Sequence, residues 1–335
     1  MKISVAIPTF NEESSIHKTL KSLLSQTLKP CEIIIADGGS TDNTLKAIEQ
    51  FDSREIPIIV VDNSEKLCGT GRNIAVLHAK NDMIAFIDSD NIAAKNWLEE
   101  LSRPFDSDSS VEVVFGRFFP NPETQFERII DAVVFPGFAD TDTEIRTVKD
   151  TGDMNTPCCS CMLIKKTVFE KIGGFPGWLR TSEDKLFFKK LLKSNSNIKY
   201  NPKAVIHHPT RKSTSALFRQ YFSYGTGSAC SAIPSKEIGS LMIKFFLGMV
   251  LLALSIWNPL FVLIVFMGIG RRVYRWGYSV VLKRDKNYFA GLGILWIPII
   301  LLTRDIALVL GHLAGYGLYL TNRRYRDKLN EYLHQ

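Results

Sequence analysis

Two aspartates follow directly after an apolar segment in the sequence IAFIDSD at residues 84–90. Four apolar residues at strand length are typical of a buried strand, and carboxylates at its end are not explained by packing, because unpaired charge beside a core is costly. On an extended segment Asp88 and Asp90 point the same way and could bind one divalent cation. Such Mg²⁺ or Mn²⁺ ions commonly complete their shell with phosphate oxygens, which favours a nucleotide diphosphate ligand. An Asp-rich turn that caps the next helix is the alternative.

The segments around this pair alternate between strand and helix patterns. Strands are expected at residues 2–8, 32–36, 56–61 and 84–87, with helices between them at residues 15–24, 44–51 and 70–79. This order predicts an α/β fold with a right-handed, doubly wound, mostly parallel sheet. Ligands of such sheets bind beyond the carboxyl ends of the strands. Pro8-Thr9, Asp37-Gly38 and the aspartate pair fall there, so three loops should meet at one site.

Five sequence elements occur in order along residues 1–230: IPTFNEE at 7–13, DGGSTDNT at 37–44, GTGRNIA at 69–75, DSD at 88–90, and GGF followed by SED at 173–184. Each element alone is weak evidence, but together, in this order, they resemble family 2 glycosyltransferases with the GT-A fold. The resemblance implies a Rossmann-like, nucleotide-sugar-binding sheet in residues 1–235. It also implies a UDP- or GDP-sugar as donor and a divalent cation, Mn²⁺ or Mg²⁺, as cofactor.

The resemblance assigns donor contacts to residues from several of these elements. By this assignment the first loop and Asp37 contact the base and ribose, although Gly38 replaces a second aspartate that many relatives carry, which leaves the base open. An arginine at position 72 would lie near the base or the diphosphate, where a guanidinium binds well. A turn role for Asp37 and a surface salt bridge for Arg72 are the alternatives. The full set of expected donor contacts is Pro8, Thr9, Glu12, Asp37, Arg72, Asp88, Ser89, Asp90 and Arg219.

The pair Glu183-Asp184 matches the family's E-D motif, whose aspartate serves as general base. An acceptor hydroxyl is a poor nucleophile at neutral pH, so a carboxylate must take its proton during attack. The resemblance therefore implies that Asp184 is the base and that Glu183 positions it or binds acceptor hydroxyls. The same residues could act as a helix N-terminus with acids in its first turn, and both roles are compatible.

Two further elements follow the E-D motif. His207 and His208 end a strand expected at 204–206, where relatives often place a histidine near the metal or diphosphate; a half-exposed strand end is the alternative. The segment FRQYFSYGTG at 218–227 resembles an element of membrane-attached, non-processive members. Its Arg219 could bind a lipid phosphate or the donor diphosphate, or could lie on a solvated helix face.

The composition changes near residue 240. From Leu241 onward there are twelve Lys and Arg residues against four Asp and Glu, whereas the whole chain of 335 residues carries a net charge of +7. The positive surplus therefore belongs to the tail, which favours anionic membrane lipid as a partner and argues against nucleic acid. Residues 236–335 are expected to form membrane-associated helices with basic flanks.

Two apolar stretches in this tail, residues 245–269 and 288–320, are long enough to enter a membrane. Met1 leads directly into a strand, so no signal peptide is expected and the catalytic domain should lie on the cytoplasmic side of the cell membrane. The tail contains basic clusters at residues 271–286 and 323–328, and such clusters prefer that side. Each stretch would then turn back, at Asn258-Pro259 and at Arg304-Asp305, and the first would be a re-entrant or strongly kinked hairpin. Two ordinary spans are the alternative.

Two regions are less specific. The cysteine-rich segment at 158–161 lacks the spacing of a zinc site, and we expect small buried residues of a strand. Residues 118–153 are expected to form either a flap over the site or a solvated insertion.

The resemblance, together with the apolar and basic tail, implies a membrane-attached, metal-dependent, inverting glycosyltransferase. Its acceptor would be a hydroxyl group of a polyprenyl-linked saccharide or a glycolipid, because a water-soluble acceptor would not require membrane attachment. A polyprenyl-phosphate glycosyltransferase, a nucleotidyltransferase and a non-catalytic module that binds sugar nucleotides are the alternatives.

Overall fold

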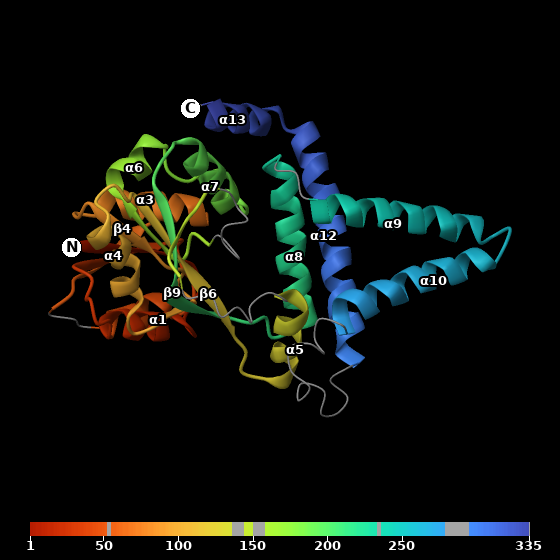
Figure 1. Cartoon of the computed structure of the whole chain (residues 1–335), viewed down its shortest axis with the longest axis horizontal. Helices are drawn as coiled ribbons and strands as arrows, with labels where there is room; N and C mark the ends of the chain where they lie inside the picture. Colours follow the sequence, from red (N-terminus) through yellow and green to blue (C-terminus); the bar gives the residue numbers. More distant parts are fainter. Residues whose placement is uncertain (52–54, 136–143, 150–157, 233–235, 279–294, 335) are drawn as a thin grey trace. The chain divides into compact units, whose positions relative to one another are not determined.

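The computed structural model describes residues 1–51, 55–135, 144–149, 158–232, 236–278 and 295–334 (Figure 1). The chain divides into two compact units. The first comprises residues 1–121, 141–209 and 330–335, and the second comprises residues 122–140 and 210–329. Each unit is described by itself.

The first unit is built on a mixed sheet with the strand order β3-β2-β1-β4-β8-β6-β9-β5, and β7 pairs with β9. The pairs β1–β2, β2–β3, β1–β4 and β6–β9 are parallel, whereas β8 runs antiparallel to β4 and β6. The mostly parallel sheet expected from the sequence is thus present, with antiparallel strands added at β5, β7 and β8.

The strands and helices of this unit follow the expected alternation closely. Their bounds are β1 (Ile3–Thr9), α1 (Ile16–Leu24), β2 (Glu32–Asp37), α2 (Thr44–Glu49), β3 (Ile58–Asp62), α3 (Cys68–His78), β4 (Met83–Phe86), β5 (Ile92–Ala93), α4 (Trp97–Ser107), β6 (Val113–Asn121), β7 (Arg146–Thr147), β8 (Met162–Lys165), α6 (Lys166–Lys171), α7 (Glu183–Lys193) and β9 (Ile198–Pro209).

Hydrophobic cores cover both faces of the sheet. On one face, alternate residues of β1 and β2 such as Val5 and Ile35 pack with apolar residues of α1 and α4. On the other face, Ala6 and Ile34 pack with α3, α6 and α7. Figure 1 shows these two sets of helices on opposite sides of the strands. This alternation arises because successive side chains of a strand point to opposite faces, and it leaves the strand ends as the place for polar loops.

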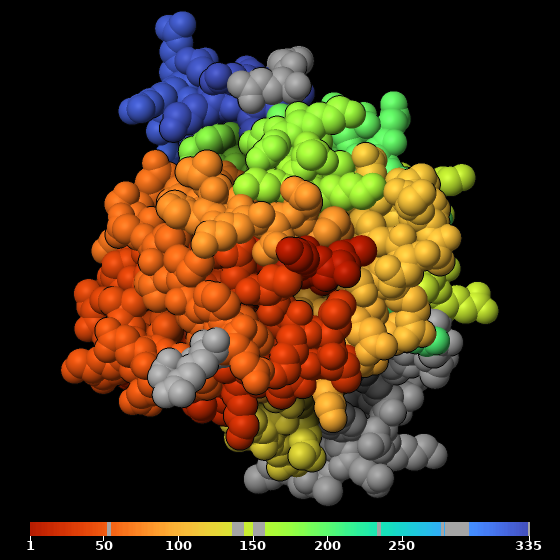
Figure 2. All heavy atoms as spheres, turned by 90° about the vertical axis from the view of Figure 1, so that its left-hand side faces the viewer, coloured from red at the N-terminus to blue at the C-terminus, as the bar shows by residue number. Residues whose placement is uncertain are grey.

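The chain begins at the amino end of β1, and the side chain of Met1 is exposed. Figure 2 shows these first residues, in dark red, at the surface among orange segments of the same unit. The functional loops predicted from the sequence follow the opposite, carboxyl ends of the parallel strands.

The second unit is helical. It contains α5 (Gln125–Val134), α8 (Thr214–Cys230), α9 (Lys236–Leu254), α10 (Leu260–Arg272), the π-helix η2 (Val273–Tyr278), α12 (Trp296–Thr321) and most of α13 (Arg323–His334). Helix α8 was expected within the catalytic domain at residues 1–235, but its contacts are mainly with the other helices of this second unit.

Helices α8 and α12 approach each other through glycines. A Cβ added at Gly225 would lie 2.4 Å from the carbonyl oxygen of Leu308, and one at Gly311 would lie 2.0 Å from that of Phe222. Such short distances leave no room for a side chain, so the two backbones are in direct contact. Small residues allow this kind of packing between helices.

Helices α9 and α10 form a hairpin that turns at Asn258-Pro259, as expected (Figure 1). Its apolar side chains are exposed along both helices and at the turn, for example Ile243 at 70%, Trp257 at 78% and Phe266 at 65%. Helices α9 and α12 are long and apolar enough to cross a membrane by length and composition.

The turn expected at Arg304-Asp305 is wrong, because α12 continues through both residues. Their charges are buried and paired instead of marking a turn. Arg304 pairs with Glu237 of α9, and Asp305 accepts hydrogen bonds from Arg272 of α10 at 2.9 and 3.2 Å. Paired charges can remain inside a helix bundle where unpaired ones could not.

The cysteine-rich segment also differs from its expectation. Strand β8 begins at Met162, so Cys158, Cys159 and Cys161 precede the strand in a turn rather than lying within it. Cys159 and Cys161 are buried as expected. Of the expected flap, residues 136–143 and 150–153 lie outside the described residues, as do Lys283, Arg284 and Lys286 of the basic cluster in the tail.

Candidate functional site

The carboxyl ends of three neighbouring parallel strands bring polar residues together. Thr9 of β1 pairs with Asp37 of β2, and Asp37 pairs with Asp62 of β3. Thr9 is buried, and its hydroxyl oxygen has no hydrogen-bond partner among the described residues. A buried hydroxyl is costly when it is unsatisfied, so Thr9 offers a polar group to a ligand at this edge.

Asp37 organises the loop that follows β2. Its carboxylate accepts hydrogen bonds from the backbone N–H groups of Gly39 and Ser40 at 3.0 and 2.9 Å, and from the hydroxyl of Ser40 at 2.6 Å. Gly39 has φ of +71°, a conformation that favours glycine. The turn role weighed for Asp37 is therefore present, and the bonds fix the carboxylate in place.

The loop between β1 and α1 is fixed by contacts at the start of α1 and with α3. The carboxylate of Glu12 accepts a hydrogen bond from the hydroxyl of Ser15, just before α1. Pro8 lies under the start of α3, where a Cβ added at Gly71 would lie 3.1 Å from the Cβ of Pro8. Gly71 thus allows α3 to contact β1 closely and places the next residue, Arg72, near the strand ends.

Arg72 lies at the centre of the site. One terminal nitrogen donates to Asp88 at 2.7 Å and the other donates to Glu183 at 3.0 Å. The guanidinium lies over the ring of Phe175, 5.1 Å from its centroid, and only 4% of the residue is exposed. The surface salt bridge considered for Arg72 is wrong: the guanidinium is buried, and its two ion pairs join the loop after β4 to the start of α7.

Glu183 and Asp184 begin α7. Burial raises the pKa of Glu183 to about 7, although the positive charge of Arg72 opposes the rise. Asp184 is less buried, and its carboxylate accepts a hydrogen bond from the backbone N–H of Lys185 at 2.8 Å. The expected helix N-terminus is present, so the two acids are fixed by the first turn of α7.

The aspartate pair lies in a turn and not on an extended strand. Strand β4 ends at Phe86, and the N–H of Asn91 donates to the carbonyl of Asp88 at 3.1 Å. The two carboxylates therefore do not have to point the same way, and they have different partners. Asp88 pairs with Arg72, whereas Asp90 lies 3.9 Å from Nδ1 of His208. The buried Ser89 accepts a hydrogen bond from Thr19 through its carbonyl oxygen.

The two histidines at the end of β9 differ in their contacts. Nδ1 of His208 is also 2.8 Å from the side-chain oxygen of Asn91, which places this ring beside the aspartate turn. His207 lies next to the ring of Phe119, and burial lowers its pKa. Of the two histidines, His208 is therefore the one that lies beside Asp90, a candidate metal ligand.

A complete metal-binding cluster is not formed by protein side chains alone: within the described residues, no three His, Cys, Asp or Glu side chains come together at ligand spacing. Asp90 and His208 bring one carboxylate and one imidazole within 3.9 Å of each other, which is too few ligands for a divalent cation unless ligand oxygens supply the remaining positions.

The remaining expected donor contact, Arg219, lies on α8 in the second unit. The site of the first unit also contains residues that were not assigned contacts from the sequence. Asn91 is fully buried and contacts His208, and Phe175 lies under Arg72. The position of Phe175 directly after Gly173-Gly174, inside a recognised element, is a signal that could have identified it.

Comparison with known proteins gives a consistent result. The sequence model of glycosyl transferase family 2 matches residues 4–173. The O-antigen chain rhamnosyltransferase RfbN of Salmonella typhimurium is 27% identical over 248 residues, which cover 71% of this chain and 76% of RfbN. The glucosyltransferase WfgD of Escherichia coli, named for a GlcNAc-diphosphoundecaprenol acceptor, is 33% identical over 97 residues, 29% of this chain and 38% of WfgD.

The fold is also found in a solved structure. The crystal structure of residues 1–349 of TarS from S. aureus, in complex with UDP, superposes with a TM-score of 0.50 at 18% identity. The match covers 96% of this chain and 91% of the TarS chain.

Proposed function

Because this chain belongs to glycosyltransferase family 2, we propose that it transfers a sugar from a nucleoside diphosphate sugar to a hydroxyl group of a lipid-linked acceptor, with inversion. The observation that carries the proposal is that the buried Arg72 forms ion pairs with both the partly exposed Asp88 and the buried Glu183. Arg72 thereby connects the aspartate turn after β4, which is assigned to donor binding, with the start of α7, which is assigned to catalysis. The UDP complex of TarS and the lipid diphosphate in the name of WfgD support the two substrate classes.

In this proposal the donor binds at the carboxyl ends of β1, β2 and β4. Asp37 and Thr9 contact the base and ribose, with Pro8 and Glu12 shaping the loop between them. Arg72 has a positioning role, because both of its terminal nitrogens already bind carboxylates. Ser89 fixes the aspartate turn through its backbone.

Asp184 is the general base for the transfer. It takes the proton of the acceptor hydroxyl, whose oxygen forms the bond to the anomeric carbon while the bond from that carbon to the phosphate oxygen breaks. The electron pair leaves with the nucleoside diphosphate, and a single displacement of this kind inverts the anomeric centre. General base catalysis typically contributes a factor of about 10²–10⁴ to the rate. Glu183 holds Arg72 beside the base and orients the first turn of α7.

A divalent cation would neutralise the charge of the leaving diphosphate. Asp90 and His208 would bind it. His207 precedes His208 in β9 and contacts Phe119, and Asp88 is paired with Arg72, so neither of these two is assigned as a direct ligand. Because the protein supplies few ligands, affinity for the cation should be low without donor and should rise when the diphosphate is present.

The chain would be attached to the membrane through the α9–α10 hairpin and α12, with the catalytic unit in the cytoplasm. The hairpin exposes apolar side chains on a scale that a soluble surface rarely carries, and lipid is the partner that would cover them. A single cysteine introduced at Arg275, labelled from each side of the membrane, tests this topology. External labelling would exclude a hairpin that returns to the cytoplasm.

The function is tested with purified protein in detergent. A panel of sugar nucleotides is screened by thermal shift with and without Mn²⁺, because a bound donor raises the melting temperature. Transfer is then measured with the donor that binds. We expect Asp184→Asn to retain the thermal shift and to lose at least a hundredfold of the transfer rate. Asp82→Asn, which changes an exposed carboxylate of the same unit, is the matched control. Equal rates in Asp184→Asn and wild type would refute the assignment, and a lack of any donor shift would favour another function.

A further inference from the structure

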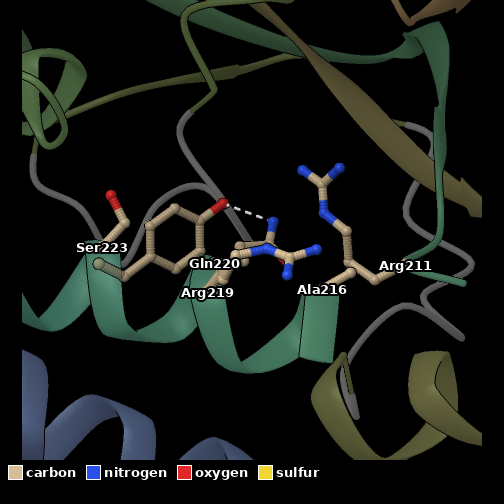
Figure 3. Close-up of a pocket in the computed structure, with 6 residues that line it drawn as sticks. Arg211, Ala216, Arg219, Gln220 and Ser223 are labelled. Carbon is tan, nitrogen blue, oxygen red and sulfur yellow. Dashed lines mark hydrogen bonds between the residues drawn. The ribbon is translucent and has the colours of Figure 1, made fainter. Parts of the chain in front are cut away.

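The second unit contains an open cavity, lined mainly by residues with polar or charged side chains, that the donor site does not use. It has a volume of about 400 Å³ and is lined by Arg211, Ala216, Arg219, Gln220, Ser223 and Tyr224. Figure 3 shows these side chains along one side of α8, with Arg211 projecting from the loop that precedes the helix. The spacing of 216, 219, 220, 223 and 224 is that of one helix face, whereas Gly225 and Phe222 contact α12.

The cavity carries positive charge that the protein does not neutralise. In the part of the chain that the structure describes, neither Arg211 nor Arg219 forms an ion pair or a side-chain hydrogen bond. The Nε of Arg211 is buried and has no hydrogen-bond partner among the described residues. Two guanidinium groups on one cavity repel each other, and a buried N–H group without a partner is costly. An anion bound between them would remove both costs.

Neutral donors line the same cavity. The side-chain nitrogen of Gln220 donates to the hydroxyl oxygen of Tyr224 at 2.9 Å, which fixes both groups on the cavity wall (Figure 3). The cavity also lies at the first turns of α8, where Ser213 accepts a hydrogen bond from the N–H of Ala216 and the helix dipole favours negative charge. Guanidinium groups bind phosphate oxygens through paired hydrogen bonds, so phosphate or diphosphate is the anion that this set of groups recognises best.

The unit that holds the cavity also carries the apolar helices. Helix α8 packs along α12, and the exposed α9–α10 hairpin belongs to the same unit. A phosphate group bound here would thus be held by the part of the chain that is suited to lipid.

We propose that Arg211 and Arg219 bind the diphosphate that joins lipid to saccharide in the acceptor. This assignment rests on the proposed function, since it takes the acceptor to be lipid-linked. It replaces the expectation that Arg219 contacts the donor: the donor diphosphate is bound by the first unit, and the acceptor diphosphate by α8.

The first test measures binding without turnover. Full-length protein in detergent is titrated with a polyprenyl diphosphate, with the corresponding polyprenol, and with phosphatidylglycerol. Wild-type protein should bind the diphosphate at least tenfold more tightly than the alcohol. Arg211→Gln and Arg219→Gln should each lose most of this preference. Lys212→Gln is the matched control, because Lys212 is adjacent in sequence, 76% exposed in its side chain, and does not line the cavity.

Two outcomes of this titration would overturn the proposal. Unchanged diphosphate binding in both arginine variants would overturn the proposal. A preference for phosphatidylglycerol that equals the preference for the diphosphate, and that the same variants lose, would make the cavity a general site for anionic lipid and would also overturn it.

A second measurement separates this proposal from the proposed function. Kinetics are measured with the lipid diphosphate acceptor and with the same saccharide on a phosphate-free alkyl chain. We expect Arg219→Gln to raise the KM for the first acceptor at least tenfold and to leave the KM for the second acceptor and for the donor unchanged. An increase confined to the donor KM would assign the cavity to the donor and refute the proposal, although the chain would still be a glycosyltransferase. The binding titration does not depend on turnover, so it tests the cavity even if no transfer is found.

Discussion

Arg72 donates a hydrogen bond to Glu183 at 3.0 Å across 111 residues of sequence, and both side chains are buried. The same guanidinium donates to Asp88. One arginine therefore connects the aspartate turn after β4 with the first turn of α7. The two elements that donor binding and proton transfer require are positioned relative to each other by this side chain.

Replacement of Arg72 should destabilise the first unit. Arg72→Ala leaves the carboxylates of Asp88 and Glu183 without their buried partner, and loss of one member of such a pair typically costs about 3–5 kcal/mol. Arg72→Lys keeps the charge but cannot reach both carboxylates with separate nitrogens, so it should give an intermediate loss. The free energy of unfolding, measured with urea in detergent, checks both.

The control for this series is Lys29→Ala, because Lys29 pairs with Glu55 in the same unit and both side chains are exposed, at 52% and 76%. Exposed pairs contribute little to stability, so this variant should be close to wild type. Equal stability of Arg72→Ala and Lys29→Ala would show that the buried network does not support the fold.

The stability contributed by Glu183 should depend on pH. Burial raises its pKa from 4.5 to about 7, so the folded state binds an additional proton between these two values. The contribution is complete below about pH 4.5 and is lost as the pH rises to about 7. The melting temperature of wild type relative to Glu183→Gln, which cannot titrate, should therefore decrease over this range. A difference that increases with pH would mean that the ion pair with Arg72 outweighs the cost of burial.

Thiol reactivity should separate one cysteine from the others. Cys31 is exposed, whereas Cys159 and Cys161 are buried, and burial raises the pKa of both thiols. Thiolate is the reactive form, so native protein should be alkylated at Cys31 at pH 7.5, and the thiols of Cys159 and Cys161 should react only after unfolding. Peptide mass mapping after a timed maleimide pulse checks this, with Cys31→Ser as control. Rapid modification of Cys159 or Cys161 in the native state would favour a redox or metal role for that segment.

Much of the first unit could be predicted from its sequence because the information is local. Apolar alternation in β1 and β2 and the helical period of α1 depend on neighbouring residues, and the loops at Thr9 and Asp37 follow from strand direction. The contact of Arg72 with Glu183 could not be predicted in this way, since it depends on the packing of α3 against β1 and on the place of α7. The sequence indicated that Arg72 binds a negatively charged group. It did not indicate that the groups it binds are the carboxylates of Asp88 and Glu183.

Two expectations failed for related reasons. The segment at 88–90 was treated as an extension of β4, but the strand ends at Phe86 and a turn follows, which a short apolar run does not reveal. A turn was expected at Arg304-Asp305 because the basic clusters on both sides of this apolar stretch were assigned to the cytoplasmic side, so the stretch had to turn back. The partners of this charge pair, Glu237 and Arg272, come from α9 and α10, so only the tertiary structure shows that both charges are neutralised.

The contact between α8 and α12 can be tested with two glycines of the same helix. A methyl group at Gly311 would lie 2.0 Å from the carbonyl oxygen of Phe222, whereas no atom of the described residues lies within 4 Å of a Cβ added at Gly317. Gly311→Ala must therefore push the helices apart, and because the obstacle is backbone, no side chain can move to make room. Gly317→Ala should instead be neutral or stabilising by up to about 1 kcal/mol, since alanine favours a helix. Thermal unfolding in detergent and cross-linking between cysteines introduced on α8 and α12 measure the two effects. Equal cross-linking and equal melting temperatures for the two variants would show that the helices do not pack through Gly311.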